Sequence, residues 1–302
     1  MFFSGSKYLE NLKTNNNNIY IVQKEKPGYN SQCNLLFMYE SFVNTILQLA
    51  PMSKFLYKNW ENVDFNANDI IIVIGCHFTE NDFKNFKNKN LYIIFYWTEP
   101  EVVQERSERN IAQYCDEIYL YSKSLFISQQ KFCDQQKIRF VPILKQETKS
   151  FVNYLKKKDN IKLSFLGNLG FRSPNVRNFF RSKSYFEHRN NLFTENTYNM
   201  YMVRNTNIFL NITKSGNSLV PFCRICKLLS HKCLVISERC DKIDEELLED
   251  MVYFCDSLID IEKTFYNLIS KSPQELYNLS YKNYIKFSNK FSVKNDNLFL
   301  IK

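Results

Sequence analysis

The residues best suited to hold a phosphate follow a strand predicted at residues 208–212. Lys214 comes just after that strand, and a polar turn containing Asn217 and Ser218 precedes a helix predicted over residues 220–229. A polar turn of this kind caps the helix, whose free N–H groups and positive dipole end then face an anion. The turn therefore predicts a phosphate site with contacts from Asn217 and Ser218.

Arg224 and two acidic residues extend this candidate site. Arg224 lies in the first turns of the predicted helix, where a guanidinium can form bidentate charge-assisted hydrogen bonds to a phosphate. The next predicted strand, residues 233–237, leads directly to Glu238, and Asp241 follows shortly after. A carboxylate in that place can accept hydrogen bonds from ribose hydroxyls. Glu238 or Asp241 is therefore predicted to hold a ribose.

A second strand end carries a similar pattern. The strand predicted at residues 163–166 is followed by Gly167, Asn168 and then Arg172. A glycine at a strand end lets the backbone approach a phosphate, and an arginine can then bind that phosphate. The alternative is a tight turn with a solvent-exposed Arg172. Because the chain has neither a Gly-x-Gly-x-x-Gly nor a Walker sequence, a dinucleotide or P-loop site is disfavoured.

The first half of the chain offers two candidates for a general base. His77 follows a strand predicted at residues 70–75, and Glu99 follows one predicted at residues 91–96. Both would lie at the carboxyl end of a parallel sheet, where either could deprotonate an acceptor hydroxyl. The alternatives are a loop histidine satisfied by the backbone and a helix N-terminal acid that stabilises the dipole.

Several cysteines in the second half of the chain lie close enough in sequence to suggest a zinc site. Cys223-x-x-Cys226 has His231, Cys233 and Cys240 nearby, but the spacing fits a zinc site poorly. A core-facing helix and a buried strand favour cysteines that act as small hydrophobic residues. No metal site is predicted. The nine cysteines, an odd number, favour reduced thiols and a cytoplasmic location.

Strands and helices alternate along the chain, which predicts an α/β protein with two doubly wound, Rossmann-like domains that face a central cleft. A polar stretch around Lys156–Lys158 separates them, so the expected domains are residues 1–155 and 156–302. Strands are predicted at 18–23, 70–75, 91–96, 117–121, 138–141, 163–166, 208–212, 233–237 and 252–255. Helices are predicted at 35–49, 100–113, 123–133, 176–181, 195–204, 220–229, 245–250 and 261–284.

Composition narrows the class of protein. The 302 residues are 44% hydrophobic and 24% charged, which is typical of a folded soluble chain. No apolar run approaches the roughly 20 residues of a membrane span, and no signal peptide is predicted. The net charge of +9 favours anionic partners. Nucleic acid is not expected as a partner because the clustered basic and aromatic signature is missing.

Residues 163–241 resemble the nucleotide-sugar-binding half of GT-B glycosyltransferases. The match is carried by Arg224 at the start of a helix, by Leu228-Leu229-Ser230, and by the strand that leads to Ser237-Glu238. The pattern is most similar to the exostosin-like and CgeB-like branches, which include proteins of large DNA viruses. The resemblance implies two Rossmann-like domains, a donor held mainly by the second domain, and no metal requirement.

The resemblance implies a glycosyltransferase that moves a sugar from a nucleoside diphosphate sugar to a hydroxyl of a glycan, protein or lipid. Arg172, Lys214 and Arg224 would stabilise the departing diphosphate. Many retaining members carry two Glu residues eight positions apart, whereas residues 214–226 contain no acidic residue. An inactive binding or structural protein on the same fold therefore remains the alternative.

Overall fold

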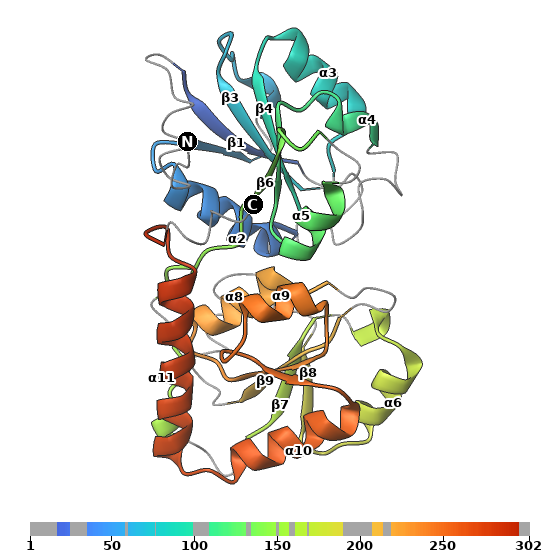
Figure 1. Ribbon diagram of the computed structural model, residues 1–302, viewed down its shortest axis with the longest axis vertical. Coiled ribbons are helices and arrows are strands. Elements are labelled where there is room, and N and C mark those ends of the chain that lie inside the picture. The colour runs from blue at the N-terminus through green and yellow to red at the C-terminus, as the bar shows by residue number, and fades with distance from the viewer. Residues whose placement is uncertain are drawn as a thin grey trace. The chain divides into compact units, whose positions relative to one another are not determined.

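The structure is a computed structural model (Figure 1). It describes residues 17–24, 35–57, 60–75, 77–98, 109–130, 134–148, 151–156, 161–167, 169–189, 207–213 and 219–295. The described residues form two compact units. Unit 1 takes those within Met1–Leu144 and Phe291–Lys302, and unit 2 takes those within Lys145–Lys290.

The division between the units lies before the expected boundary at residues 155/156, because residues after Leu144 bond within unit 2. The N–H of Gln146 donates to Ser230 Oγ at 2.9 Å, and the N–H of Val152 donates to the His231 carbonyl at 2.9 Å. The polar stretch that suggested a boundary therefore follows a segment already anchored in unit 2.

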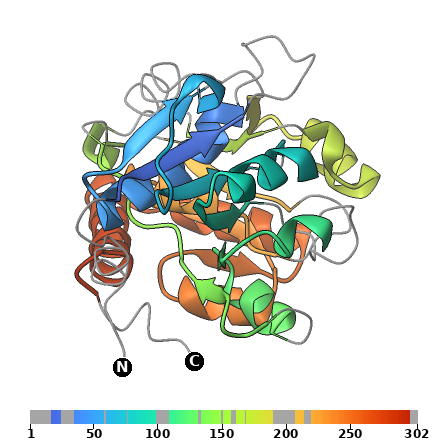
Figure 2. The ribbon, with the colours of Figure 1, turned by 90° about the horizontal axis from the view of Figure 1, so that it is seen from above.

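Unit 1 contains a parallel sheet of six strands in the order β2-β1-β3-β4-β5-β6. The strands are β1 (Ile19–Gln23), β2 (Lys54–Tyr57), β3 (Ile70–Ile74), β4 (Tyr92–Trp97), β5 (Glu117–Leu120) and β6 (Ile138–Phe140). Every residue of β3 is buried, as its continuous β-branched run predicts for a central strand covered on both faces. The side-by-side β1 and β3 can be followed in Figure 2.

The helices of unit 1 are α2 (Leu35–Leu49), α3 (Glu80–Asn88), α4 (Arg109–Ala112) and α5 (Lys123–Gln129), with a 3-10 turn η1 (Trp60–Asn62). The sequence pattern predicts α2 at these bounds, but neither α3 nor β2 is predicted. Helix α3 is mostly polar and buries Phe83 and Phe86, so its apolar period is weak. A capping box between Thr79 and Asp82 starts it instead.

Gly75 ends β3 in a backbone conformation that requires glycine. Its φ is +98°, and a Cβ at this position would lie 2.8 Å from Cε2 of the buried Tyr39. Gly75→Ala should therefore lower the free energy of unfolding by about 1–3 kcal/mol. Urea denaturation measures this change. Gly170→Ala is the control, because Gly170 is exposed and has no positive φ. Equal stability of Gly75→Ala and the wild-type protein would contradict the prediction.

Unit 2 contains a parallel sheet of five strands in the order β11-β10-β9-β7-β8. The strands are β7 (Leu163–Leu166), β8 (Phe186–Arg189), β9 (Ile208–Asn211), β10 (Val235–Glu238) and β11 (Tyr253–Cys255). From β7 the chain passes to β8 on one side and then to β9 on the other. The order thus reverses between β7 and β9, which is where doubly wound sheets bind ligands at their carboxyl edge. In unit 1 the reversal lies between β1 and β3.

The helices of unit 2 are α6 (Pro174–Arg181), α8 (Phe222–Ser230), α9 (Lys242–Leu247), α10 (Leu258–Ile269) and α11 (Pro273–Lys290), with 3-10 turns η2 (Tyr154–Lys156) and η3 (Leu169–Phe171). The helix expected over residues 261–284 is two helices, because Pro273 begins a new one. The helix expected at residues 195–204 lies outside the described residues. No helix of the described chain is long and apolar enough to cross a membrane.

The predicted fold class is confirmed: both units are α/β, with parallel strands and interleaved helices. Helices α8 and α10 lie on opposite sides of the unit 2 sheet in Figure 1. In each unit the strand exits that carry the candidate residues lie together at one edge of the sheet.

Candidate functional site

Gly167 brings the backbone after β7 against an arginine of α8. Its φ is +153°, and a Cβ added here would lie 3.2 Å from Arg224 Nη2 and 3.2 Å from Cζ of Phe165. Any side chain at this position would therefore displace the guanidinium or the ring. Glycine is required at this strand end, as the sequence predicts, and the group that comes close is Arg224.

Arg224 is held at the carboxyl end of β9. Its Nη1 donates to Asn211 Oδ1 at 3.1 Å and to the carbonyl oxygen of Ile212 at 3.3 Å. The residue lies in the first turn of α8, as predicted. The Asn211 amide donates in turn to Ser237 Oγ at 2.8 Å, which ties this arrangement to β10.

Arg172 converges on the same place. It is only 7% exposed, so the alternative of a solvent-exposed arginine is wrong. Its Nε donates to the Ile212 carbonyl at 3.0 Å, the oxygen that Arg224 also contacts. The two guanidinium carbons lie 5.1 Å (Arg172) and 5.2 Å (Arg224) from the centroid of the Phe165 ring, which supports both cations by cation–π contact.

The electrostatics of this pair favour an anion. Burial, followed by the positive charge of Arg224, lowers the pKa of Arg172 to about 10, against the opposing effect of the Glu238 carboxylate. Arg172 therefore stays charged at neutral pH, although burial and a like charge both work against it. A bound phosphate would remove this cost by pairing with both guanidiniums.

Glu238 ends β10 beside this pair. Its Oε1 accepts a hydrogen bond from the backbone N–H of Thr213 and another from Thr213 Oγ1, at 2.5 Å. This oxygen orders the chain as it leaves β9. Glu238 Oε2 has no hydrogen bond to the residues that the structure describes, so it is available to a ligand hydroxyl.

Asp241 is the N-cap of α9, where its Oδ1 accepts the N–H of Ile243 at 2.9 Å. A helix cap is the ordinary use of an aspartate at this position. The predicted ribose contact stays a prediction for this residue and for Glu238.

His188 belongs to the same cluster and was missed by the sequence analysis. Its Nε2 lies 2.6 Å from the carbonyl oxygen of Gly167, and the ring stacks on Phe165 with centroids 5.9 Å apart. The residue sits on β8, which the sequence analysis does not predict. Only the pairing of β8 with β7 brings it beside the Gly167 turn.

Five predicted site residues lie outside the described residues: Glu99, Asn168, Lys214, Asn217 and Ser218. The expected contacts of the 216–218 turn lie outside the described residues and stay a prediction. Helix α8 begins at Phe222 with Pro221 at its N-cap, two residues after the expected start at residue 220. Proline fits a helix start because its φ is fixed and it has no N–H to leave unpaired.

Three cysteines of unit 2 lie in surroundings that disfavour their thiolate form. Cys226 and Cys233 are completely buried, and burial raises the pKa of both thiols. The pKa of Cys240 is raised to about 12, again chiefly by burial. Zinc binds thiolates, which such surroundings disfavour. Within the described parts of the chain, no three His, Cys, Asp or Glu residues gather as a metal site would require.

In unit 1 the predicted His77 follows Gly75 at the end of β3, with its ring 6.5 Å from that of Tyr39. Two polar atoms flank this strand exit without hydrogen-bond partners among the described residues. They are Oε1 of the buried Gln23, which ends β1, and Oγ1 of Thr98, which follows β4. Strands β1 and β4 both pair with β3, so this edge offers unused hydrogen-bonding capacity beside His77.

The chain resembles known proteins in its structure and not in its sequence. No protein-family model matches the chain, and no curated protein sequence does. Solved structures match it. An α1,3-fucosyltransferase gives a TM-score of 0.53 at 12% identity, covering 95% of this chain and 90% of that chain. HepE (Alr3699) of Anabaena, solved with UDP-glucose, gives 0.51 at 10% identity, covering 92% and 97%. A glycosyltransferase of Rickettsia africae gives 0.51 at 11%, covering 95% and 96%.

The chain has the GT-B fold. The alignments with these three proteins, two of them glycosyltransferases, run through both units and span nearly the whole of each matched protein. In two longer matched proteins the chain spans only 54% and 57% of the length. At 10–12% identity the likeness shows the GT-B fold and leaves the reaction to be argued from the site.

Proposed function

We propose that the chain is a glycosyltransferase that moves a sugar from a nucleoside diphosphate sugar to an acceptor hydroxyl. The observation that carries this proposal is the convergence of Arg172 and Arg224 on the carboxyl edge of the unit 2 sheet, where the strand order reverses. A diphosphate is the leaving group that needs two fixed cations at such a place.

The two arginines would act on the bond that breaks. As the bond from the sugar to the diphosphate lengthens, negative charge grows on the departing phosphate oxygens. The Ile212 carbonyl and Phe165 already hold both guanidiniums in place, so little reorganisation is needed when the charge develops. Lys214 is proposed to add a third positive charge, and Gly167, Asn168, Asn217 and Ser218 are proposed to line the phosphate path.

The ribose is proposed to bind at the end of β10. Glu238 Oε2 can accept a hydrogen bond from a ribose hydroxyl while Oε1 holds Thr213. Asp241, which already caps α9, is the second candidate for this contact. HepE, a structural neighbour, was solved with UDP-glucose, which makes uridine diphosphate sugars the first donors to test.

The acceptor is proposed to bind unit 1, as a hydroxyl of a glycan, protein or lipid. His77 or Glu99 would remove the hydroxyl proton as the sugar is transferred. The unpartnered oxygens of Gln23 and Thr98 beside β3 would orient that acceptor.

The branch of the fold and the compartment are proposed on narrower grounds. Arg224 in the first turn of α8 supports the exostosin-like and CgeB-like branch, including its viral members. Six cysteines in the described chain are free, which supports the cytoplasm of a cell or of an infected host.

Turnover should not need a metal ion. The sequence contains no Asp-x-Asp pair, the element with which metal-dependent transferases of the other major fold hold a diphosphate, and Arg172 and Arg224 are proposed to take that task. Release of nucleoside diphosphate from a panel of nucleotide sugars should proceed at the same rate with and without EDTA. Complete loss in EDTA that manganese restores would refute the metal-free mechanism.

A catalytically inactive binding protein is the second candidate, favoured by the lack of any acidic residue in positions 214–226. The two candidates give different results in the same assay. An inactive protein binds a nucleoside diphosphate sugar and releases no diphosphate with any acceptor. A transferase consumes the donor when a suitable acceptor is present.

A further inference from the structure

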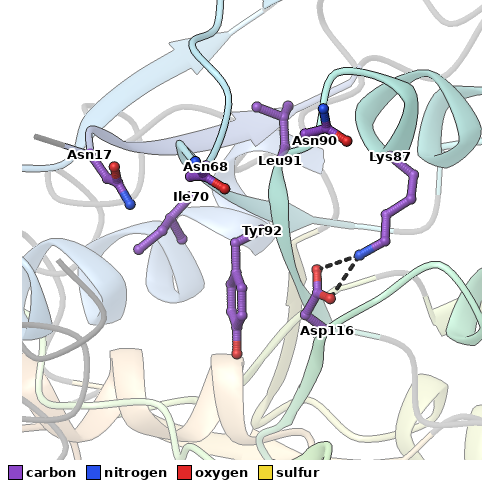
Figure 3. A pocket seen from close by; sticks show the side chains of 8 residues that line it. All are labelled: Asn17, Asn68, Ile70, Lys87, Asn90, Leu91, Tyr92 and Asp116. Atoms are coloured by element: carbon purple, nitrogen blue, oxygen red, sulfur yellow. Dashed lines mark hydrogen bonds and ion pairs between the residues drawn. The ribbon is translucent and has the colours of Figure 1, made fainter. Parts of the chain in front are cut away.

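A polar cavity of about 580 Å³ lies at the amino end of the unit 1 sheet (Figure 3). It spans the starts of neighbouring strands, with Ile70 and Tyr92 as the first residues of β3 and β4, and with Asp116 just before β5. His77 lies beyond the opposite end of β3, so roughly 16 Å of strand separates this cavity from the candidate acceptor edge. The cavity is therefore separate from the candidate acceptor edge of unit 1.

Two carboxamides on one side of the cavity are free to bind a ligand. Asn68 and Asn90 are both exposed, and their side chains form no hydrogen bond within the described chain. The N–H of Asn68 donates to the carbonyl of Asn90 at 2.8 Å, which keeps the two turns together. Each carboxamide can donate two hydrogen bonds and accept two. In Figure 3 both asparagines lie near the backbone end of Tyr92, and the Tyr92 ring extends away from that end.

The two charged side chains that line the cavity, Lys87 and Asp116, form an ion pair and so give the lining no net charge. Lys87 Nζ lies 2.7 Å and 2.9 Å from the two carboxylate oxygens of Asp116, and one of these oxygens also accepts the N–H of Ile93 at 2.8 Å. A highly charged ligand such as a nucleoside diphosphate would meet a carboxylate with no spare cation. A purely apolar ligand would leave the two carboxamides without partners.

The remaining lining fits the carbon face of a sugar ring. Tyr92 is partly exposed and presents an aromatic ring, while Ile70 and Leu91 are buried and apolar. Aromatic and aliphatic surfaces beside a few convergent polar groups are typical of small-ligand sites of this volume. A saccharide ring matches this lining, because it carries closely spaced neutral hydroxyls and also presents a face of C–H groups.

We propose that this cavity is a binding site for a neutral saccharide, separate from the donor site of unit 2 and from the acceptor edge of unit 1. Asn68 and Asn90 would bind its hydroxyls, and the Tyr92 ring would pack against its carbon face. The proposal does not depend on transfer chemistry, so it can hold or fail whether or not the chain is an active transferase.

The test is a titration of the isotope-labelled full chain with maltotriose, triacetylchitotriose and mannotriose, followed by NMR. At least one of them should cause saturable shifts of the backbone signals of Asn68, Asn90 and Tyr92, and saturating UDP should not abolish these shifts. If none of the three binds, or if sialyllactose binds and the neutral sugars do not, the proposal is wrong. The NMR titration uses the wild-type protein alone, so its result does not depend on whether a variant folds.

A double variant tests the two carboxamides. Asn68 and Asn90 have φ of +71° and +55°, so Asn68→Gly with Asn90→Gly removes both amides and keeps a backbone that glycine adopts freely. Saccharide affinity should fall about tenfold. Asp250→Gly is the matched control, since Asp250 has φ +63° and lies in unit 2. Unchanged affinity in the double variant, or an equal loss in the control, would overturn the proposal.

Discussion

Removal of the general base should lower turnover by about 10²–10⁴-fold while donor affinity stays nearly unchanged. The two variants are His77→Ala and Glu99→Gln, assayed for release of nucleoside diphosphate and, separately, for donor binding. A base acts on the acceptor proton in the transition state, so its loss slows the chemical step and spares the binding of the donor. Glu99 is the favoured candidate in the sequence, because Trp97 two residues before it could cover the site and exclude water.

The structure adds a reason to test His77. Its strand exit is flanked by Oε1 of Gln23 and Oγ1 of Thr98. Neither atom has a hydrogen-bond partner in the part of the chain that the structure describes, and both are proposed to orient an acceptor beside the imidazole. Glu61→Gln is a control, because Glu61 is an exposed acid of unit 1 in the η1 turn. Full activity in both His77→Ala and Glu99→Gln would place the base elsewhere.

Arg224→Ala should weaken binding of a nucleoside diphosphate by about 1.5–3 kcal/mol, the range for hydrogen bonds to charged groups, or about 10- to 140-fold. Arg224 is anchored by Asn211 and Ile212, so its charge is directed before the ligand arrives. Arg224→Lys should recover only part of the affinity, because lysine keeps the charge and loses the planar fork. Isothermal titration calorimetry measures the affinity of the wild-type protein, Arg224→Ala and Arg224→Lys for the nucleoside diphosphate.

Arg181→Ala is the matched control for this series. Arg181 lies at the exposed end of α6 in the same unit, so its removal changes the net charge equally and should leave affinity unchanged. If Arg224→Ala unfolds at the same temperature as the wild-type protein and binds the nucleoside diphosphate equally well, Arg224 is not part of the donor site. An equal loss of affinity in Arg181→Ala would mean that the effect comes from the net charge of the protein and not from a contact between Arg224 and the ligand.

The fold and the arginine pair could be predicted because they depend on local patterns and on the geometry of parallel sheets. The β-branched run at residues 70–74 predicts a central strand. Arg172 and Arg224 follow different strand exits, and the carboxyl ends of parallel strands meet at one edge. The sequence could not show that Arg172 is buried, because its burial depends on Phe165 and on the carbonyl of Ile212.

Other features depend on pairing that no local pattern encodes. His188 joins the site only because β8 pairs with β7, and the four-residue β8 has no run of apolar residues to signal a strand. Helix α8 starts at Phe222 rather than at residue 220, because Pro221 stands at its N-cap. Gln23 lies beside Ile74 at the end of β3, a neighbour that strand register determines, and its Oε1 has no hydrogen-bond partner among the described residues.

Thermal unfolding with a panel of nucleoside diphosphates tests the central claim most directly. A ligand at 100 times its dissociation constant stabilises the folded state by about 2.7 kcal/mol. The donor site proposed at Arg172 and Arg224 predicts that at least one nucleoside diphosphate stabilises the wild-type protein in EDTA and stabilises Arg224→Ala much less at the same concentration. Stabilisation by none of them, or equal stabilisation of both proteins, would contradict it.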